Sequence, residues 1–408
     1  MPIQTRREFK KTMAGLSMLS VLPGSARSAN DAIHVGVIGC GDRARNALMK
    51  RVFAVSGSCH AVITAVCDVW RQHREEAAAM VEEHYAQKPA QYVDYKDLLR
   101  EKEIDAVIIA TPEHQHTTML QDAIAAGKDV YIEKPLAMQI EELNEAVDAV
   151  KASERVVQVG TQLRSYPSFT GCKKVVQEGQ LGNVHKIMQV RNSYRPYWHR
   201  YKRPIKQSDT DWGKFLMHRP DRPFSADQHS AWYGYREFSL GPIASLMAHF
   251  IDLVHYITGE PFPHSAVALA GNYVWEDRYT VPDSVHALLE YRDKFMVSYC
   301  TSYGNGGGNY MRFLGTKGTI DATNWRKPIL SGEGSEAEDR IRETSQVPDV
   351  SMPQHMEDWL QCIRTRKQPN ADIHAGEQHA VACILANEAL IHNRRMVYDR
   401  DRRRIEPA

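Results

Sequence analysis

The sequence predicts an α/β protein with a doubly wound parallel sheet in its first part and a second α/β domain built on an open, largely antiparallel sheet. Between residues 33 and 160, short apolar stretches alternate with helical stretches, the pattern of a parallel sheet covered by helices on both faces. After residue 160, strand-like stretches follow one another at hairpin spacing, which favours antiparallel pairing. A chain of 408 residues is long enough for two such domains.

The composition restricts the partners that the protein can have. Charged residues make up 25% of the chain and the formal net charge is +1, so no basic excess indicates a nucleic acid. No apolar run approaches the roughly 20 residues that span a bilayer, and no stable membrane span is expected. The seven cysteines are scattered without a C-x-x-C pair, which indicates neither a disulfide framework nor a zinc site.

Residues 1–29 have the parts of an export signal. Arg6 and Arg7 precede Phe9, a modest apolar segment follows at residues 13–22, and small residues come after it. The paired arginines resemble a twin-arginine signal, which the export machinery reads as an address. The sequence therefore predicts export by the twin-arginine route, to the periplasm or otherwise out of the cytoplasm. A basic disordered tail is the alternative interpretation.

Residues 30–160 form the first predicted domain, and its opening turn predicts a dinucleotide site. The string G-C-G-D-R-A at residues 39–44 follows an apolar strand and opens a helix, the context in which G-x-G-x-x-G/A binds a dinucleotide. Gly39 allows the tight turn, Gly41 lets the backbone approach a pyrophosphate, and Ala44 lets helix and strand pack closely. Asp42 and Arg43 stand at the helix start, where free N–H groups favour phosphates. A chance glycine turn is the alternative.

The rest of this domain continues the alternation. Strands are expected at residues 62–67, 105–110, 130–132 and 156–159, and helices up to residue 52 and at residues 71–84, 115–126 and 139–153. Asp68 ends the second strand, where a carboxylate accepts hydrogen bonds from both ribose hydroxyls of NAD and repels the 2′-phosphate of NADP. A solvent-exposed turn residue is the alternative for Asp68, and the nearby Arg71 keeps NADP open as the cofactor.

Residues 161–408 form the second predicted domain, which would bind the substrate and join subunits. Its expected helices are residues 167–177, 243–258, 352–366 and 376–393, and its expected strands are residues 184–192, 266–273, 284–291, 295–301, 310–314 and 318–320. Because an antiparallel sheet can leave one face free, we expect a homo-oligomer through this sheet. Residues 193–239 are a long irregular stretch rich in Trp and Tyr, which favours a functional loop over disorder.

Several motifs together resemble those of the Gfo/Idh/MocA oxidoreductases over nearly all of the chain after residue 32. They are, in order, G-x-G-x-x-A at residues 39–44, A-T-P at 110–112 with His116, G-K-D-V at 127–130, E-K-P-L-A at 133–137, Gly182 in Q-L-G-N-V, His249-x-x-Asp252, and G-T-K-G-T at 315–319. The resemblance implies a Rossmann domain, a second α/β domain, and oxidation or reduction of a sugar or polyol carbon with NAD or NADP. The cofactor contacts that it implies are Thr111, Pro112, His116, Glu133 and Lys134.

Lys134 and His249 are the catalytic residues that the resemblance implies. Lys134 would orient the reacting hydroxyl and stabilise developing alkoxide charge. Its alternative role is a surface salt bridge with Glu133. His249 would act as the general base, because imidazole titrates near neutrality. Its alternative role is that of a satisfied core histidine.

This chain departs from the family pattern at Ser245. Many relatives have an aspartate there, four residues before the histidine and on the same helix face. A serine can hydrogen-bond a sugar hydroxyl but cannot hold a proton as a carboxylate does. Either another acid supplies the role, with Asp252, Glu237 or Asp211 as candidates, or the chemistry is altered.

The resemblance also implies a set of substrate contacts. They are Arg164, Asn192, Tyr194, Trp198, Trp232, Arg236, Ser245 and Asp252. Trp and Tyr rings would stack on sugar C–H surfaces, and Arg and Asn would hydrogen-bond hydroxyls, with loop packing as the alternative for each. No metal is expected, because neither His114 with His116 nor His249 with Asp252 and His255 makes a complete ligand set.

Three functions are compatible with these motifs. The favoured one is an exported oxidoreductase that acts on a sugar, polyol or glycoside with a tightly bound, internally recycled NAD, because the periplasm lacks a free nicotinamide pool. In the oxidative direction, hydride leaves a carbinol carbon for the nicotinamide while His249 takes the hydroxyl proton. The second is a glycosidase that oxidises one carbon, eliminates the neighbouring glycosidic bond and returns the hydride. The third, prompted by Ser245, is a non-catalytic sugar-binding protein.

Overall fold

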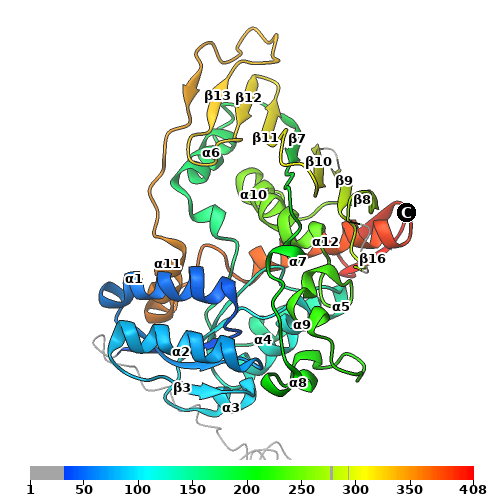
Figure 1. The fold of residues 1–408 in the computed structure, drawn as a ribbon. Coiled ribbons are helices and arrows are strands. Elements are labelled where there is room, and N and C mark those ends of the chain that lie inside the picture. The colour runs from blue at the N-terminus through cyan, green and yellow to red at the C-terminus, as the bar shows by residue number, and fades with distance from the viewer. Residues whose placement is uncertain (1–31, 276–278, 293) are drawn as a thin grey trace, which may run out of the picture. The chain divides into compact units, whose positions relative to one another are not determined.

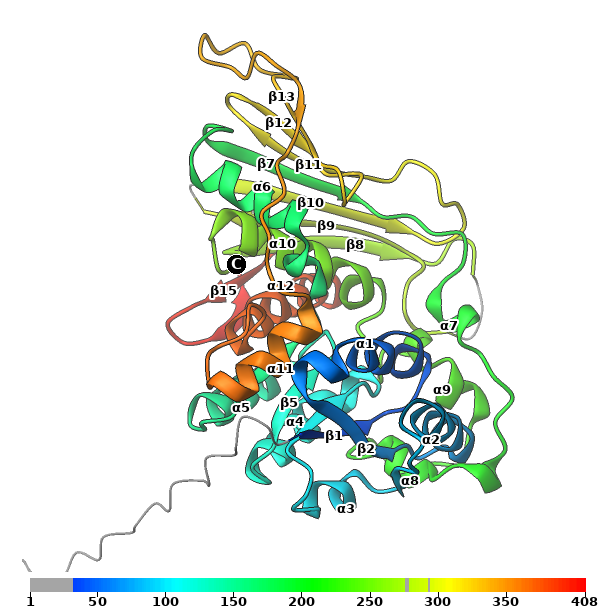
Figure 2. The same cartoon turned by 90° about the vertical axis from the view of Figure 1, so that its left-hand side faces the viewer.

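The computed structural model describes residues 32–275, 279–292 and 294–408, and the predicted export signal lies outside them. Within these ranges the predicted fold class is confirmed: a six-stranded parallel sheet is followed by a ten-stranded, mostly antiparallel sheet (Figure 1 and Figure 2). No helix of the described ranges is long and apolar enough to cross a membrane. The seven cysteines all lie within them and carry free thiols.

The six-stranded sheet has the strand order β3-β2-β1-β4-β5-β6. Its strands are β1 (Ile33–Ile38), β2 (Ala61–Cys67), β3 (Ala90–Tyr92), β4 (Ala106–Ile109), β5 (Asp129–Ile132) and β6 (Val157–Val159). Neighbouring strands run parallel. Because the order reverses between β1 and β4, the crevice for a ligand lies at the carboxyl ends of these strands. The sequence does not predict β3, because its three residues are largely exposed.

The helices of this domain alternate with the strands. They are a π-helical turn (Ala44–Met49) that leads into α1 (Lys50–Cys59), then α2 (Arg71–Tyr85), α3 (Tyr95–Arg100), α4 (His116–Ala125) and α5 (Ile140–Lys151). The sequence predicts neither α3 nor the full length of α1. α1 continues past residue 52 because Val55 and Cys59 stay buried at helical spacing. It ends at His60, whose left-handed φ of 46° lets its N–H bond the carbonyl of Ser56.

The ten-stranded sheet has the order β14-β13-β12-β11-β7-β10-β9-β8-β15-β16. Its strands are β7 (Val184–Val190), β8 (Ser265–Gly271), β9 (Ser284–Tyr291), β10 (Phe295–Ser302), β11 (Tyr310–Gly315), β12 (Gly318–Asp321), β13 (Ile329–Ser331), β14 (Ser345–Gln346), β15 (Met396–Asp399) and β16 (Arg404–Pro407). β7 pairs in parallel with β10, whereas the hairpins pair antiparallel. The sequence predicts neither the short β13 and β14 nor the β15–β16 hairpin, whose alternation is hidden by charged residues at 399–404.

Helices pack on this sheet and also return to the first domain. They are α6 (Pro167–Gln177), α7 (Tyr197–Arg200), α8 (Trp212–Leu216), α9 (Ala226–Ser230), a π-helical turn (Ile243–Met247) leading into α10 (Ala248–Thr258), α11 (His355–Thr365) and α12 (Ile373–Ile391). α12 packs on β8 and β9, and α10 packs on α6 and α12. The sequence places α11 with the second domain, but its buried Met356, Trp359 and Leu360 join the hydrophobic cluster of α1.

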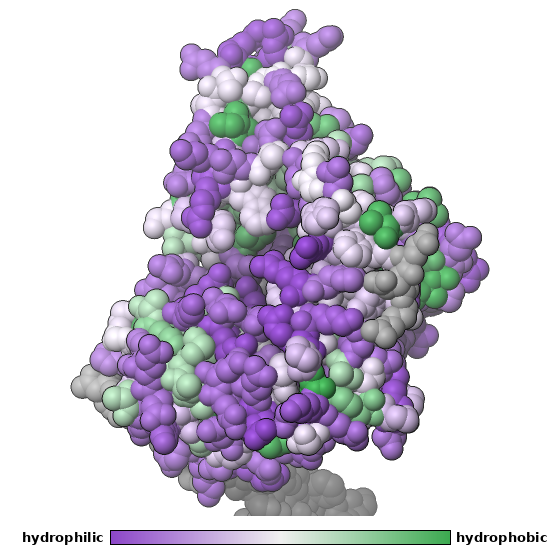
Figure 3. Space-filling model, viewed as in Figure 1, coloured by the Kyte–Doolittle hydropathy of each residue, from purple (hydrophilic) through white to green (hydrophobic). Residues whose placement is uncertain are grey.

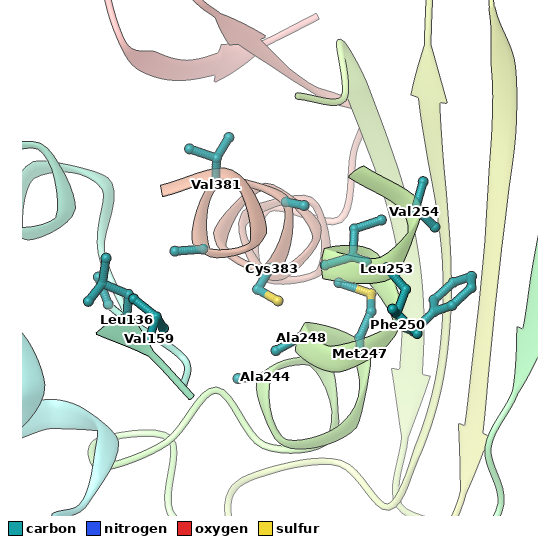
Figure 4. Packing of buried hydrophobic residues seen from close by; sticks show 14 of the residues in the cluster. Leu136, Val159, Ala244, Met247, Ala248, Phe250, Leu253, Val254, Val381 and Cys383 are labelled. Atoms are coloured by element: carbon teal, nitrogen blue, oxygen red, sulfur yellow. The ribbon is translucent and has the colours of Figure 1, made fainter. Parts of the chain in front are cut away.

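One hydrophobic cluster continues from the first sheet into the second across α12. Figure 4 shows Val381 and Cys383 of α12 between α10 on one side and Leu136 and Val159 on the other. A Cβ on Gly376 of α12 would lie 2.8 Å from side-chain carbons of both Leu136 and Val159, so glycine is required for this close approach. The loop after β5 and the helix α10 are therefore held by the same core, and these two elements carry the predicted catalytic residues.

Candidate active site

A cleft of about 1150 Å³ opens at the carboxyl ends of β1, β2, β4 and β5. The turns after these strands form one wall, and residues from the irregular stretch 193–239 form the opposite wall. The predicted site residues that line it are Gly39, Gly41, Asp42, Arg43, Asp68, Thr111, Pro112, His116, Glu133, Lys134, Trp232, Ser245 and His249. The structure thus brings the predicted cofactor residues and the two predicted catalytic residues to one place, except Ala44.

The glycine turn has the shape that a dinucleotide requires. Gly39 has a φ of +85°, and a Cβ there would lie 2.7 Å from the carbonyl carbon of Ala110. At Gly41 a Cβ would meet only the ring of His73, at 3.8 Å, so this backbone is open to the cleft. Ala44 is fully buried beneath the turn. The residues therefore fit a pyrophosphate that lies against the backbone of Gly41.

Asp68 lines the cleft at the end of β2. Its Oδ2 accepts a hydrogen bond from the N–H of Cys40 at 2.7 Å, and its Oδ1 accepts one from the N–H of Trp70 at 2.8 Å. Burial alone would raise the pKa of Asp68, but the neighbouring His73 and these N–H groups hold it below its ordinary value. An ionised carboxylate here suits the ribose hydroxyls of NAD. Arg71 is the residue for which NADP remained a possible cofactor in the sequence analysis. Its Nη2 donates a hydrogen bond to Asp209 Oδ1 at 2.7 Å.

Ion pairs fix the glycine turn to its surroundings. Arg43 Nε donates to Glu133 Oε1 at 2.7 Å, which joins the turn to the loop after β5. Asp42 pairs with Arg45 at 3.2 Å and with Arg203 at 3.3 Å, and Arg203 belongs to the stretch 193–239. The opposite wall of the cleft is therefore connected directly to the dinucleotide turn.

His116 joins two further loops of the cleft rather than pointing a free nitrogen into it. One ring nitrogen lies 2.7 Å from the carbonyl oxygen of Pro135, and the other lies 3.0 Å from that of Thr111. Burial lowers the pKa of His116. A neutral ring in this position holds the A-T-P loop against the E-K-P loop, which is a supporting role at the cofactor site.

Lys134 and His249 face the same part of the cleft. Lys134 Nζ donates to the backbone carbonyl of Ser245 at 2.7 Å, and burial lowers its pKa. His249 is partly buried, and its Nδ1 has no hydrogen-bond partner within the described part of the chain. Burial and the positive charge of Lys134 hold the pKa of His249 well below its ordinary value. A neutral imidazole that lines the cleft can accept a proton.

Most of the predicted substrate contacts lie away from the cleft. Trp232 and Ser245 line it. Trp198 is 2% exposed and packs edge-on against Tyr303. Asn192 donates to the carbonyl of Gly307. The others that the structure places outside the cleft lining are Arg164, Tyr194, Arg236 and Asp252.

Arg164 and Asp252 bind each other instead of facing a ligand. The Nε of Arg164 donates to Oδ2 of Asp252 at 3.0 Å, and its Nη2 donates to Oδ1 at 2.5 Å. Arg164 also donates to the carbonyl of Asn370 at 2.9 Å. Both side chains are buried. A bidentate pair of this kind fixes α10 to the segment that follows β6, which is a structural role.

The three acids considered as substitutes for a carboxylate at position 245 are committed elsewhere. Asp252 pairs with Arg164, Glu237 pairs with Arg222, and Asp211 caps α8 by accepting from the N–H of Lys214 at 3.0 Å. None of the three is among the residues that line the cleft in the described ranges.

Glu113 is a buried carboxylate of the cleft that the sequence does not predict as a site residue. It lines the cleft, it is 3% exposed, and burial raises its pKa to about 7. It follows the A-T-P motif directly, at the carboxyl end of β4, where ligands of a doubly wound sheet bind. This position is the feature of the sequence that could have indicated Glu113 as a site residue.

The opposite wall carries further residues that no motif indicates. They include Tyr197, Arg200, Tyr201, Arg203, His229 and Tyr233, all of which line the cleft. The wall is pinned to the first domain, because the N–H of Asp211 donates to Val69 at 3.0 Å and the side chain of Gln115 donates to Phe215 at 2.7 Å. Composition alone predicts a functional loop here, but these contacts decide which rings face the cleft.

Comparisons with known proteins agree with this arrangement. A family model described as an oxidoreductase family with an NAD-binding Rossmann fold matches residues 33–161. The model of the oxidoreductase family's C-terminal alpha/beta domain matches residues 173–396. The first model covers the six-stranded sheet and the second covers most of the ten-stranded sheet, and together they include both walls of the cleft.

Individual relatives are more distant. The chain is 32% identical over 151 residues to the inositol 2-dehydrogenase of Burkholderia multivorans, covering 37% of this chain and 43% of that protein. It is 27% identical over 290 residues to a glycosyl hydrolase family 109 protein of Saccharopolyspora erythraea, covering 65% of this chain and 57% of that one. The chain therefore matches about half of the length of these relatives.

The fold itself is also seen in solved structures. The WlbA dehydrogenase from Bordetella pertussis, solved in complex with NADH and UDP-GlcNAcA, superposes with a TM-score of 0.69. The sequences are 19% identical, and the match covers 90% of this chain and 99% of that one. With both family models matched in order and the fold shared, the chain belongs to the Gfo/Idh/MocA oxidoreductase family.

Proposed function

We propose that this protein is an NAD-dependent oxidoreductase that acts on a carbinol carbon of a sugar, polyol or glycoside. The observation that carries the proposal is the position of Lys134 and His249 beside the dinucleotide turn in one cleft. The relative named inositol 2-dehydrogenase supports a polyhydroxylated substrate. NAD, when held by Gly41 and Asp68, supplies the hydride acceptor or donor for this chemistry.

The side chains of the cleft divide the remaining work. The His249 imidazole accepts the proton of the hydroxyl that is oxidised, and returns it in the opposite direction. Lys134 presents an ammonium to the same oxygen and stabilises its developing negative charge. On the opposite wall, the Tyr197 and Tyr233 rings lie 5.5 Å apart between centroids, and Trp232 stacks on Tyr233 at 3.6 Å. Such aromatic faces suit the apolar surfaces of a pyranose ring.

A second candidate is cleavage of a glycosidic bond through oxidation, elimination and reduction. It is favoured by the wall of residues 193–239, which is connected to the dinucleotide turn through Arg203 and Asp42 at 3.3 Å. A cofactor enclosed in this way is suited to recycling in place rather than to exchange with each turnover. The relative named glycosyl hydrolase family 109 protein supports the same direction.

Replacing His249 by Gln is expected to lower turnover by about 10²–10⁴-fold, the range of a lost general base. The assay follows the oxidation state of NAD and the release of a chromogenic aglycone across a panel of free sugars, polyols and glycosides. Aglycone release by the parent would select the second candidate. His392→Gln is the matched control, since His392 is exposed at the end of α12 and outside the cleft lining. Full parental activity in the His249→Gln protein would remove His249 from the mechanism, and an inactive parent would favour a sugar-binding protein.

We also propose that a second copy of the chain covers the free face of the second sheet. Val267, Leu269, Leu288 and Met296 of β8, β9 and β10 are 40%, 68%, 43% and 48% exposed. Most of the surface in Figure 3 is hydrophilic, and one of its hydrophobic patches lies at the right-hand side near β8 and β9. An apolar sheet face of this kind favours an isologous contact between identical subunits.

Export by the twin-arginine route is proposed on the pattern around Arg6 and Arg7. The double replacement Arg6→Lys and Arg7→Lys is expected to stop export, because the receptor reads the guanidinium pair, while the folded protein stays in the cytoplasm. Cell fractionation followed by immunoblotting measures the distribution. Undiminished accumulation outside the cytoplasm would show that these arginines are no export signal.

A further inference from the structure

Two side chains of the first domain form hydrogen bonds with the turn that precedes the helix carrying His249. Glu113 accepts hydrogen bonds from the hydroxyl of Ser239 and from the N–H of Leu240, both at 2.9 Å. Lys134 donates to the carbonyl of Ser245 at 2.7 Å. A carboxylate and an ammonium thus hold the two ends of residues 239–245.

Hydrogen bonds within this turn connect the end held by Glu113 with the end held by Lys134. The N–H of Gly241 donates to the hydroxyl of Ser239 at 2.9 Å, and the N–H of Ser245 donates to the carbonyl of Gly241 at 2.9 Å. The chain of bonds therefore runs from Glu113 through Ser239, Gly241 and Ser245 to Lys134. His249 lies one helical turn beyond Ser245, so its position depends on this chain.

Two carboxylates favour the ammonium form of Lys134: Glu133, which has the larger effect, and Glu113. The neighbouring carboxylate, Glu133, is bonded to Arg43 at 2.7 Å. Glu113 and Lys134 act on each other, and each favours the charged form of its partner. The other titratable groups that Glu113 influences are Tyr233, Tyr303 and Cys383. The pKa of each of them is raised by burial, so they stay neutral and do not offset the carboxylate.

We propose that Glu113 is a positioning residue that, together with Lys134, fixes the turn that places His249, and whose carboxylate adds to that of Glu133 in holding Lys134 in its ammonium form. The inference deepens the proposed function and rests on it for its role in turnover. Burial raises the pKa of Glu113 to about 7, so the carboxylate is present above neutral pH and is lost as the pH falls below it. Glu113→Gln keeps the shape of the side chain and can still accept from Leu240, but it removes the charge.

The first measurement needs no substrate. The intact, as-purified protein is treated with acetic anhydride between pH 6 and 10, and acetylation of Lys134 is quantified by mass spectrometry against the exposed Lys102. In Glu113→Gln the midpoint for Lys134 is expected to move to lower pH, with acetylation at pH 8.5 roughly three- to tenfold faster than in the parent, since one pKa unit is a factor of ten. Glu377→Gln removes another buried carboxylate, one that pairs with Lys151 at 3.3 Å, and should leave the Lys134 midpoint unchanged.

The second measurement is the pH profile of kcat on a substrate found with the panel. The parent is expected to show an ionisation near pH 7 that Glu113→Gln lacks, with KM changed less than kcat. An unchanged Lys134 midpoint in Glu113→Gln would overturn the inference, whatever the activity. If the Lys134 midpoint shifts in Glu113→Gln but the parent protein turns over no carbohydrate, the interaction of Glu113 with Lys134 is supported and the proposed function is overturned instead. A shifted midpoint with an unchanged kcat profile would overturn the role of the pair in turnover.

Discussion

A valine at position 41 is expected to abolish dinucleotide binding and leave the protein folded. The added Cβ would meet only the His73 ring at 3.8 Å, so the protein itself has room for it. The branched side chain would stand where the pyrophosphate must approach the backbone. We expect NAD affinity to fall at least about a hundredfold, which corresponds to about 2.7 kcal/mol. Titration calorimetry on cofactor-free protein measures the affinity, and circular dichroism checks the fold.

Two other glycines make the comparison specific. Gly57→Val adds the same side chain on the exposed side of α1, where nothing lies within 4 Å, and should bind NAD as the parent does. Gly39→Val should instead lose stability, because its φ of +85° and the 2.7 Å approach to Ala110 leave no place for a side chain. Parental NAD affinity in Gly41→Val would place the pyrophosphate elsewhere.

Breaking the Arg164–Asp252 pair is expected to cost about 3–5 kcal/mol of unfolding free energy, the range for leaving one member of a buried ion pair alone. Arg164→Met strands the carboxylate of Asp252, which is fully buried. Replacing both, with Arg164→Met and Asp252→Leu, should recover much of this loss, because no unpaired charge remains. Urea unfolding of the three proteins measures the difference.

A surface pair provides the control for this experiment. Lys174 of α6 and Glu178, which caps the end of this helix, lie 3.8 Å apart with exposed side chains. Lys174→Met should therefore change the unfolding free energy by less than about 1 kcal/mol. If Arg164→Met is as stable as the parent, the pair is not structural, and the substrate contact that the family resemblance implies for Arg164 becomes the better explanation.

Most of the fold could be predicted from local sequence patterns. α6 (Pro167–Gln177) and β9 (Ser284–Tyr291) have the bounds that the sequence predicts, because their apolar periodicity is uninterrupted and proline or turn residues mark their ends. The glycine turn and Asp68 could be predicted as dinucleotide contacts for the same reason, because the sequence pattern of such a site lies within one strand–turn–helix unit and the strand that follows. What a single element encodes could be predicted.

The parts that the sequence did not reveal depend on contacts between distant positions. Arg164 and Asp252 are 88 residues apart, and nothing near either one indicates that they bind each other. Glu113 can be recognised as a positioning residue only from the structure, because its partner Ser239 lies 126 residues later in the chain. The stretch 193–239 has no periodicity, so its composition predicts a role but not which of its rings face the cleft.

The pinning of residues 193–239 onto the first domain has a consequence for how a cofactor is acquired. Synthesis delivers the glycine turn before the stretch that later covers it, because chains are made from the N-terminus and domains fold in that order. We expect that a dinucleotide bound to the nascent first domain is partly covered when Asp211 docks on Val69. Its release would then be faster when this stretch opens locally. Hydrogen exchange at residues 209–215 and the rate of NAD release should therefore follow the same temperature dependence.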